Sequence, residues 1–146
     1  MLFRSALCDI LIPTWNNPQY LFPCIQSILM YTVPDDLFHI YIVNNGDLEQ
    51  MVTYQNSPYI TILQQDRNLG WEGGLKAGLA ASHAPYVLFM NDDTHIPSHQ
   101  RLWLDKLLGH FVYSDCAAVG PTSNMVMGLQ QSLILLHPEI LRVSTS

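Results

Sequence analysis

Residues 85–94 read PYVLFMNDDT, an unbroken apolar run followed at once by an amide, two carboxylates and a hydroxyl. A run of four to eight apolar residues bounded by turn signals is typical of a strand that is covered on both faces. We therefore expect Tyr86–Met90 to form the central strand of a sheet, with Asn91, Asp92 and Asp93 directly beyond its carboxyl end.

The remainder of the chain alternates short apolar runs with segments of helical period. Further strands are expected at Leu7–Ile12, Phe38–Val43, Tyr59–Leu63 and Ala117–Gly120. Apolar residues recur three and four positions apart in the intervening segments, at Leu21–Leu29, Trp71–Leu79 and Leu104–Phe111. Strands that alternate with helices indicate an α/β fold, in which a mostly parallel sheet carries helices on both faces.

The start of the first helix is marked by Asn17 and Pro18, a typical cap and first-turn pair. Pro23 lies farther along the same segment. Because proline removes a backbone hydrogen bond inside a helix, we expect regular helix to begin only near Pro23.

The composition favours a globular domain and argues against several other classes. The chain has 146 residues, of which 49% are hydrophobic and 12% charged. This length suits a single domain spanning residues 1–146. Six basic residues against twelve acidic ones, a net charge of −6, argue against a nucleic-acid partner. No apolar run approaches the ~20 residues that cross a bilayer, so no membrane span is expected.

Polar residues follow three of the expected strands at the point where each strand ends. Pro13 and Thr14 follow the first, Asn44 and Asn45 follow the second, and residues 91–93 follow the strand quoted above. Ligands of parallel sheets bind beyond these carboxyl ends. Adjacent carboxylates repel each other unless a cation lies between them, and carboxylate oxygens suit Mg²⁺ or Mn²⁺. The segment thus predicts a metal site, and the alternative is a polar turn that caps the next helix.

A glycine-rich segment, DRNLGWEGG at residues 66–74, leads into the second expected helix. Backbone N–H groups of such a segment can hold phosphate, and the alternative is that the glycines serve close packing. The segment matches neither a Walker loop nor a dinucleotide fingerprint. Trp15 and Trp71 flank the expected site, where an indole either stacks on a base or sugar or packs in the core.

Four separated blocks resemble the family 2 glycosyltransferases of GT-A fold, in the same order and at similar spacing. They are ILIPTWN at 10–16, IVNNG at 42–46, RNLGWEGG at 67–74 and the quoted PYVLFMNDDT. The resemblance covers roughly residues 5–125. It implies a Rossmann-like GT-A fold of the nucleotide-diphospho-sugar transferases, incomplete at the C-terminus.

The resemblance implies a nucleotide-sugar pocket made by the first three blocks. Pro13 and Thr14 would line the pocket, and Asn44 would face the base. Asn68 and Gly70 would lie beside the donor. Family members usually carry Asp at the position of Asn44, so the contact with the base is expected to differ here.

The resemblance also implies a divalent cation, Mg²⁺ or Mn²⁺, which bridges the donor diphosphate. Asn91 and Asp93 match the outer positions of the metal motif, and Asp93 is the expected direct ligand. Asp92, between them, is expected among the residues that bind the nucleotide-sugar, and so is Asn91. Asn at the first position removes one negative charge from the metal site.

The resemblance implies metal-dependent, inverting transfer of a sugar, hexosyltransferase-like, from a nucleotide-diphosphate-sugar to a glycan, lipid or protein acceptor, as in cell wall or polysaccharide biosynthesis. Inverting transfer requires a general base that takes the proton of the acceptor hydroxyl. Asp115 and Glu139 are the only late carboxylates, and neither stands in a family-like motif. The catalytic base and the acceptor-binding half are therefore expected to be missing from this chain.

The alternative function is a non-catalytic nucleotide-binding fragment, or a subunit that needs a partner. In either case an uncovered sheet edge is expected to favour self-association. The three cysteines, Cys8, Cys24 and Cys116, show no close pairing and are expected to be reduced. A cytoplasmic location follows, with peripheral association with a membrane as a variant of it.

Overall fold

The computed structural model describes residues 6–33, 37–113 and 115–121, and the backbone of residues 141–144. The chain divides into two compact units, Met1–Gln100 and Arg101–Ser146. The first unit contains β1 (Cys8–Thr14), α1 (Pro18–Tyr31), β2 (Phe38–Asn44), the 3₁₀-helix η1 (Leu48–Tyr54), β3 (Ile60–Gln64), α2 (Gly70–Ala81) and β4 (Tyr86–Phe89). The second contains α3 (Trp103–Gly109), the 3₁₀-helix η2 (His110–Val112), β5 (Ala118–Pro121) and β6 (Leu141–Ser144).

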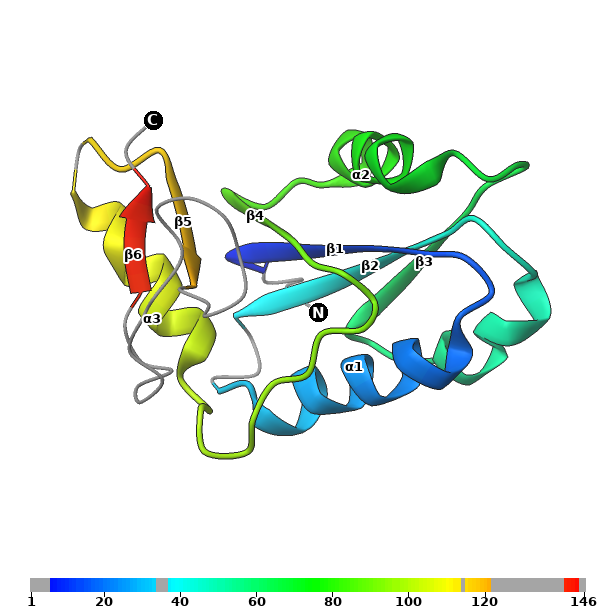
Figure 1. Ribbon diagram of the computed structural model, residues 1–146, viewed down its shortest axis with the longest axis horizontal. Coiled ribbons are helices and arrows are strands. Elements are labelled where there is room, and N and C mark those ends of the chain that lie inside the picture. The colour runs from blue at the N-terminus through cyan, green and yellow to red at the C-terminus, as the bar shows by residue number, and fades with distance from the viewer. Residues whose placement is uncertain (1–5, 34–36, 114, 122–140, 145–146) are drawn as a thin grey trace, which may run out of the picture. The chain divides into compact units, whose positions relative to one another are not determined.

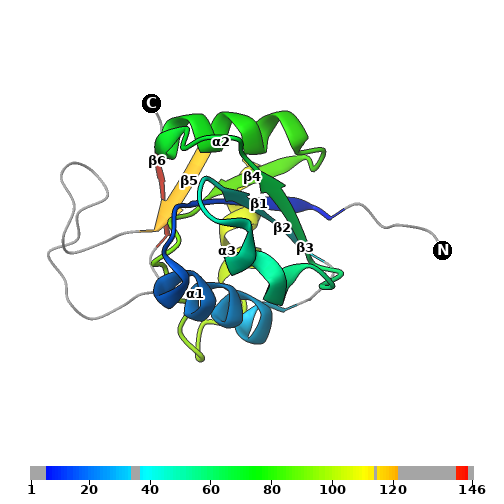
Figure 2. The ribbon, with the colours of Figure 1, turned by 90° about the vertical axis from the view of Figure 1, so that its right-hand side faces the viewer.

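The first unit is built on a four-stranded parallel sheet with the strand order β3-β2-β1-β4. The longest pairing joins β1 to β2, from Cys8 opposite Phe38 to Thr14 opposite Asn44. Helix α2 lies on one face of this sheet and α1 on the other (Figures 1 and 2). The expected α/β fold, with a mostly parallel sheet and helices on both faces, is confirmed.

The core of the first unit lies between the two middle strands and the helices. β1 and β2 contribute side chains with no exposed surface, and α1 adds an apolar face that is almost completely buried: Ile10, Leu11, Ile12, Ile40, Ile42, Leu21, Ile25 and Ile28. Burial of each such side chain stabilises the fold by about 1.5–3 kcal/mol.

Helix α1 begins at Pro18, so the expectation that regular helix would start near Pro23 was wrong. Pro23 is exposed, and so is Gln19, whose carbonyl loses its helical donor. Solvent can satisfy that carbonyl, which makes the proline tolerable. Asn17 precedes the helix as expected, but its side chain makes no capping hydrogen bond.

Helix α2 packs on the sheet through a narrow face made by Gly74, Leu75 and Gly78. The apolar series that predicted this helix marks its buried face wrongly at two positions, because Trp71 is 55% and Leu79 46% exposed. A Cβ atom at Gly74 would lie 2.9 Å from Pro13 Cβ. The small residues therefore let the helix approach β1 closely, which was the packing alternative for this segment.

Strand β4 lies at one edge of the sheet that the described residues form, and the expectation of a central strand was wrong. It pairs with β1 on one side, and Phe89 is 50% exposed. An apolar run indicates that both faces of a strand are covered by other elements. It does not distinguish a central strand from an edge strand.

A buried carboxylate ties the start of β1 to the connection between α2 and β4. Asp9 is 4% exposed, and its Oδ2 accepts hydrogen bonds from Ser82 Oγ at 2.7 Å and from the backbone N–H groups of His83 at 3.0 Å and Ala84 at 3.1 Å. A buried charge requires such partners. These bonds lie at the amino ends of the strands.

His39 stands opposite Asp9 in the β1–β2 register. Its Nε2 lies 2.8 Å from the hydroxyl of Thr61. Burial lowers the pKa of His39 below its ordinary value, and the charge of Asp9 opposes that shift.

The second unit contains an antiparallel pair, β5 and β6, in which Gly120 stands opposite Arg142. The last expected strand, at residues 117–120, is therefore present with a shift of one residue, but outside the parallel sheet. No helix in the described ranges is long and apolar enough to cross a bilayer.

Candidate functional site

The carboxyl ends of β1, β2 and β4 bring the expected site residues to one edge of the sheet. Thr14 and Asn44 form the last pair of the β1–β2 register. The β1–β4 register ends with Leu11 opposite Phe89, so three further residues on each strand lead to Thr14 and Asp92. Because β2 and β3 lie on one side of β1 and β4 on the other, this edge is the switch point at which α/β sheets bind ligands.

Residues 91–94 form a turn, which we call the strand-end turn. A hydrogen bond of 3.3 Å from the backbone N–H of Thr94 to the carbonyl of Asn91 closes it. Asp92 Oδ2 accepts hydrogen bonds from Thr14 Oγ1 at 2.8 Å and from Asn17 Nδ2 at 3.2 Å. The second residue of the turn is thus attached to the connection between β1 and α1.

The first residue of the strand-end turn is held from both helices. Trp71 Nε1, at the start of α2, donates to Asn91 Oδ1 at 3.0 Å. Cys24 of α1 donates from Sγ to the carbonyl of Asn91 at 3.8 Å. Burial raises the pKa of Cys24 to about 12, with the charge of Asp92 as a second cause, so the thiol stays protonated and able to donate.

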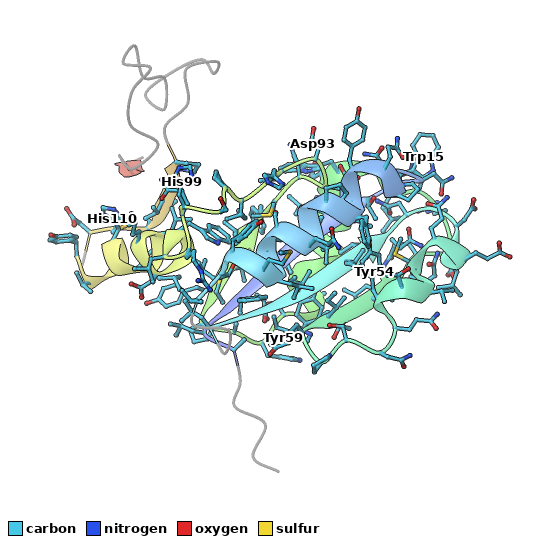
Figure 3. All side chains as sticks on the ribbon, turned by 90° about the horizontal axis from the view of Figure 1, so that it is seen from below. Trp15, Tyr54, Tyr59, Asp93, His99 and His110 are labelled. Atoms are coloured by element: carbon cyan, nitrogen blue, oxygen red, sulfur yellow. The ribbon has the colours of Figure 1, made fainter. Side chains whose placement is uncertain are left out.

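The third residue of the turn, Asp93, is exposed and makes no hydrogen bond or ion pair with the described residues (Figure 3). Across those residues, no group of three or more His, Cys, Asp and Glu side chains is arranged to hold a metal. The turn therefore offers one free carboxylate, with the amide oxygen of Asn91 keeping a second lone pair. This donor set fits Mg²⁺, which commonly uses one or two carboxylates together with substrate phosphates.

Asn44, at the end of β2, has no exposed surface. Its Nδ2 lies 3.2 Å from the carbonyls of Gly46 and Asp47 and 2.7 Å from Gln64 Oε1, and its Oδ1 accepts from the N–H of Gly46. The amide is thus directed into the turn that follows β2. A contact between Asn44 and a base stays a prediction.

Asn45 joins the end of β2 to the glycine-rich segment, a role that the sequence reading did not anticipate. Its Oδ1 accepts from the N–H of Leu69 at 3.1 Å, and its Nδ2 donates to the carbonyl of Gly70 at 3.3 Å. Asn68 Oδ1 accepts from the N–H of Gly70 at 2.8 Å. Gly70 has a φ of +71°, which favours glycine, and the helix begins there.

The connection between β1 and α1 contains both a buried and an exposed site candidate. Pro13 is buried beneath α2, whereas Trp15 is 60% exposed (Figure 3). Asn16 has a φ of +46°, and its Oδ1 accepts from the N–H of Asp47 at 2.8 Å. Since Trp15 and Trp71 are both exposed, neither packs in the core.

Of the two late carboxylates, Asp115 and Glu139, the structure describes only Asp115. Asp115 is exposed and belongs to the second unit. Glu139 lies outside the described residues.

Comparison with known proteins adds a family and a fold. The family model described as glycosyl transferase family 2 matches residues 9–129. No match was found among curated proteins.

Three solved structures of TarS from S. aureus are similar to the chain. TarS 1-349 has a TM-score of 0.60 at 17% identity, over 80% of this chain and 41% of that chain. TarS 1-349 in complex with UDP has a TM-score of 0.61 at 20% identity, over 77% and 33%. A third TarS structure has a TM-score of 0.58 at 22% identity, over 72% and 19%. The chain thus spans less than half the length of each, and the similarity establishes the fold.

Proposed function

The chain belongs to glycosyl transferase family 2, and from that membership and the strand-end turn we propose that it is the donor-binding part of a glycosyltransferase. Its ligand is a nucleotide-diphosphate-sugar, from which the complete enzyme transfers the sugar to an acceptor. The observation that carries the proposal is the meeting of Thr14 with Asp92 at the switch point of the sheet, 2.8 Å apart, beside a free Asp93. A complex of TarS with UDP supports the nucleotide as ligand.

We propose that Asp93 is the direct ligand of a divalent cation, Mg²⁺ or Mn²⁺, with Asn91 as the second protein donor. When bound, such a cation neutralises the negative charge that develops on the leaving diphosphate. A chain of net charge −6 has only six basic residues to balance that charge, and one of them, Lys76, is paired with Glu72 at 2.6 Å. Asp92 would act indirectly, because its carboxylate is engaged by Thr14 and Asn17.

The remaining expected residues are assigned by their positions around this turn. Thr14 borders the pocket and fixes Asp92. Asn44 shapes the turn after β2, which we propose lies beside the base, and Pro13 supports α2 from below. Asn68 and Gly70 set the start of α2, which we propose lies beside the donor.

The test is the binding of UDP by titration calorimetry, with Mn²⁺ and with EDTA. We expect Mn²⁺ to tighten binding by at least about tenfold, and Asp93→Asn to abolish that gain, because it removes the charged ligand. Glu49→Gln removes one exposed carboxylate of η1 outside the strand-end turn and serves as the matched control. Equal binding in EDTA, or an unchanged Asp93→Asn, would contradict the metal assignment.

Transfer with inversion also requires a general base, and we propose that Asp115 does not supply it. The isolated chain then binds the donor without transferring its sugar. A glycan, lipid or protein acceptor, a cytoplasmic or membrane-peripheral location and a role in cell wall or polysaccharide synthesis remain part of this proposal. The three free cysteines are consistent with a reducing compartment.

We further propose that the outer edge of β4 mediates self-association of this chain. In the described residues that edge pairs with no strand, and Phe89 beside it is 50% exposed. Exposed apolar edges recruit further strands, and a charged side chain blocks them. Light scattering should therefore show a dimer for the wild type and a monomer for Phe89→Lys. A monomeric wild type at high concentration would refute the association.

A further inference from the structure

Two residues of the strand-end turn accept hydrogen bonds from segments that lead to opposite faces of the sheet. Asp92 is held by Thr14 and Asn17, where the chain enters α1. Asn91 is held by the indole N–H of Trp71, where the chain enters α2. Asp93 has no partner of its own among the described residues, so its position follows from these two attachments.

Trp71 is set up for this contact by the residues before it. Gly70 adopts a φ of +71° and is fixed to Asn45 and Asn68 by its carbonyl and its N–H. The indole is 55% exposed and adds little to the core. Its hydrogen bond to Asn91 at 3.0 Å joins the first turn of α2 to the second residue after β4.

We infer that Trp71 is a positioning residue for metal-dependent donor binding: its N–H orients the amide of Asn91 and thereby the turn that presents Asp93. The inference rests on the proposed function. The indole acts through Asn91 and not as a stacking surface, so the hydrogen bond, and not the ring, carries the effect.

Three substitutions separate these roles. Trp71→Phe keeps an aromatic ring and removes the N–H. Trp71→Ala removes both. Asn91→Ala removes the acceptor. Because a single exposed hydrogen bond is at stake, Trp71→Phe should raise the Kd for UDP in Mn²⁺ by about two- to tenfold. The Kd measured in EDTA should stay unchanged, since the nucleotide contacts themselves are intact.

The decisive measurement is a double-mutant cycle on UDP binding by calorimetry. In the Asn91→Ala background, Trp71→Phe should have no further effect on the Kd in Mn²⁺, because the indole has lost the group through which it acts. Thermal unfolding of every variant checks that the fold is kept, and the exposure of Trp71 favours this.

The outcomes separate the inference from the proposed function. If wild-type chain shows no Mn²⁺-dependent binding of UDP, the proposed function fails and the inference fails with it. If the wild type binds but Trp71→Phe matches it, the inference alone is overturned. A ring role would show as Trp71→Phe normal and Trp71→Ala weak. A merely structural role would show as equal losses in Mn²⁺ and in EDTA. Either result overturns the positioning role.

Discussion

The Asp9 carboxylate should stabilise the fold by about 3 kcal/mol through its contacts to the α2–β4 connection. It accepts three hydrogen bonds, at 2.7, 3.0 and 3.1 Å, and is 4% exposed. Hydrogen bonds to a charged group contribute about 1.5–3 kcal/mol each. Ser82 and Ala84 are half-buried and His83 is exposed, so water can replace the lost acceptor in part. We therefore expect about 1 kcal/mol for each.

Urea unfolding of Asp9→Ala should show this loss as a lower midpoint with an unchanged slope. Thermal melting should fall by about 6–12 °C, since 1 kcal/mol corresponds to about 2–4 °C for a chain of this size. Ser82→Ala removes one donor and should lose about 1 kcal/mol. UDP binding by folded Asp9→Ala should be normal, because these contacts lie at the opposite ends of the strands. A loss below about 1 kcal/mol for Asp9→Ala, or an equal loss for both variants, would refute the reasoning.

Four further measurements test other parts of the structure. Gly74→Ala should destabilise the chain by about 1–2 kcal/mol in urea, although alanine gains about 1 kcal/mol in helix propensity, because its Cβ meets Pro13; a stabilised variant would contradict the close packing of α2. Burial lowers the pKa of His39, so the unfolded chain binds a proton more readily than the folded one. The free energy of unfolding should therefore fall as the pH drops below about 6.5, and it should fall less in His39→Gln. Parallel profiles of unfolding free energy against pH for the two proteins would contradict this. A thiol reagent at pH 8 should label Cys116 first and spare Cys8 and Cys24, whose pKa values burial raises to about 12; rapid labelling of all three in the folded chain would show that their burial is wrong. The isolated chain should bind UDP but transfer no sugar from a UDP-sugar to added acceptors, and robust turnover would place a catalytic base within it.

The layered α/β architecture was predictable because local patterns of apolar residues determine it. Apolar runs such as Phe38–Val43 coincide with observed strands almost residue for residue. Their polar carboxyl ends marked the site edge, since parallel strands deliver those ends to one place. The same logic predicts that Thr14 and residues 91–93 lie together, as the contact between Thr14 and Asp92 confirms.

What the sequence left open was decided by contacts between distant segments. The apolar run 86–90 says nothing about how many neighbours a strand has, so the edge position of β4 was missed. The sequence predicted close packing at the glycines of α2, but not that Gly74 and Gly78 face β1 with Trp71 left outside. Asn17 resembled a helix cap, yet its amide reaches Asp92, 75 positions away. Asn45 and Asp9 gave only weak signals, a second amide after a strand and a charge within an apolar run.

The attachment of the strand-end turn has a consequence for the order in which the molecule matures. Thr14 and Asp92 are separated by 78 positions, and contacts over such distances form late. During synthesis the β1–α1 connection emerges early and lacks its contacts to Asp92 until β2, β3 and α2 have been made. A nascent or cleaved polypeptide that stops before β4 would carry the first three blocks and still have no fixed place for the proposed cation. Competence to bind the proposed donor would thus arrive in one step, as β4 pairs with β1.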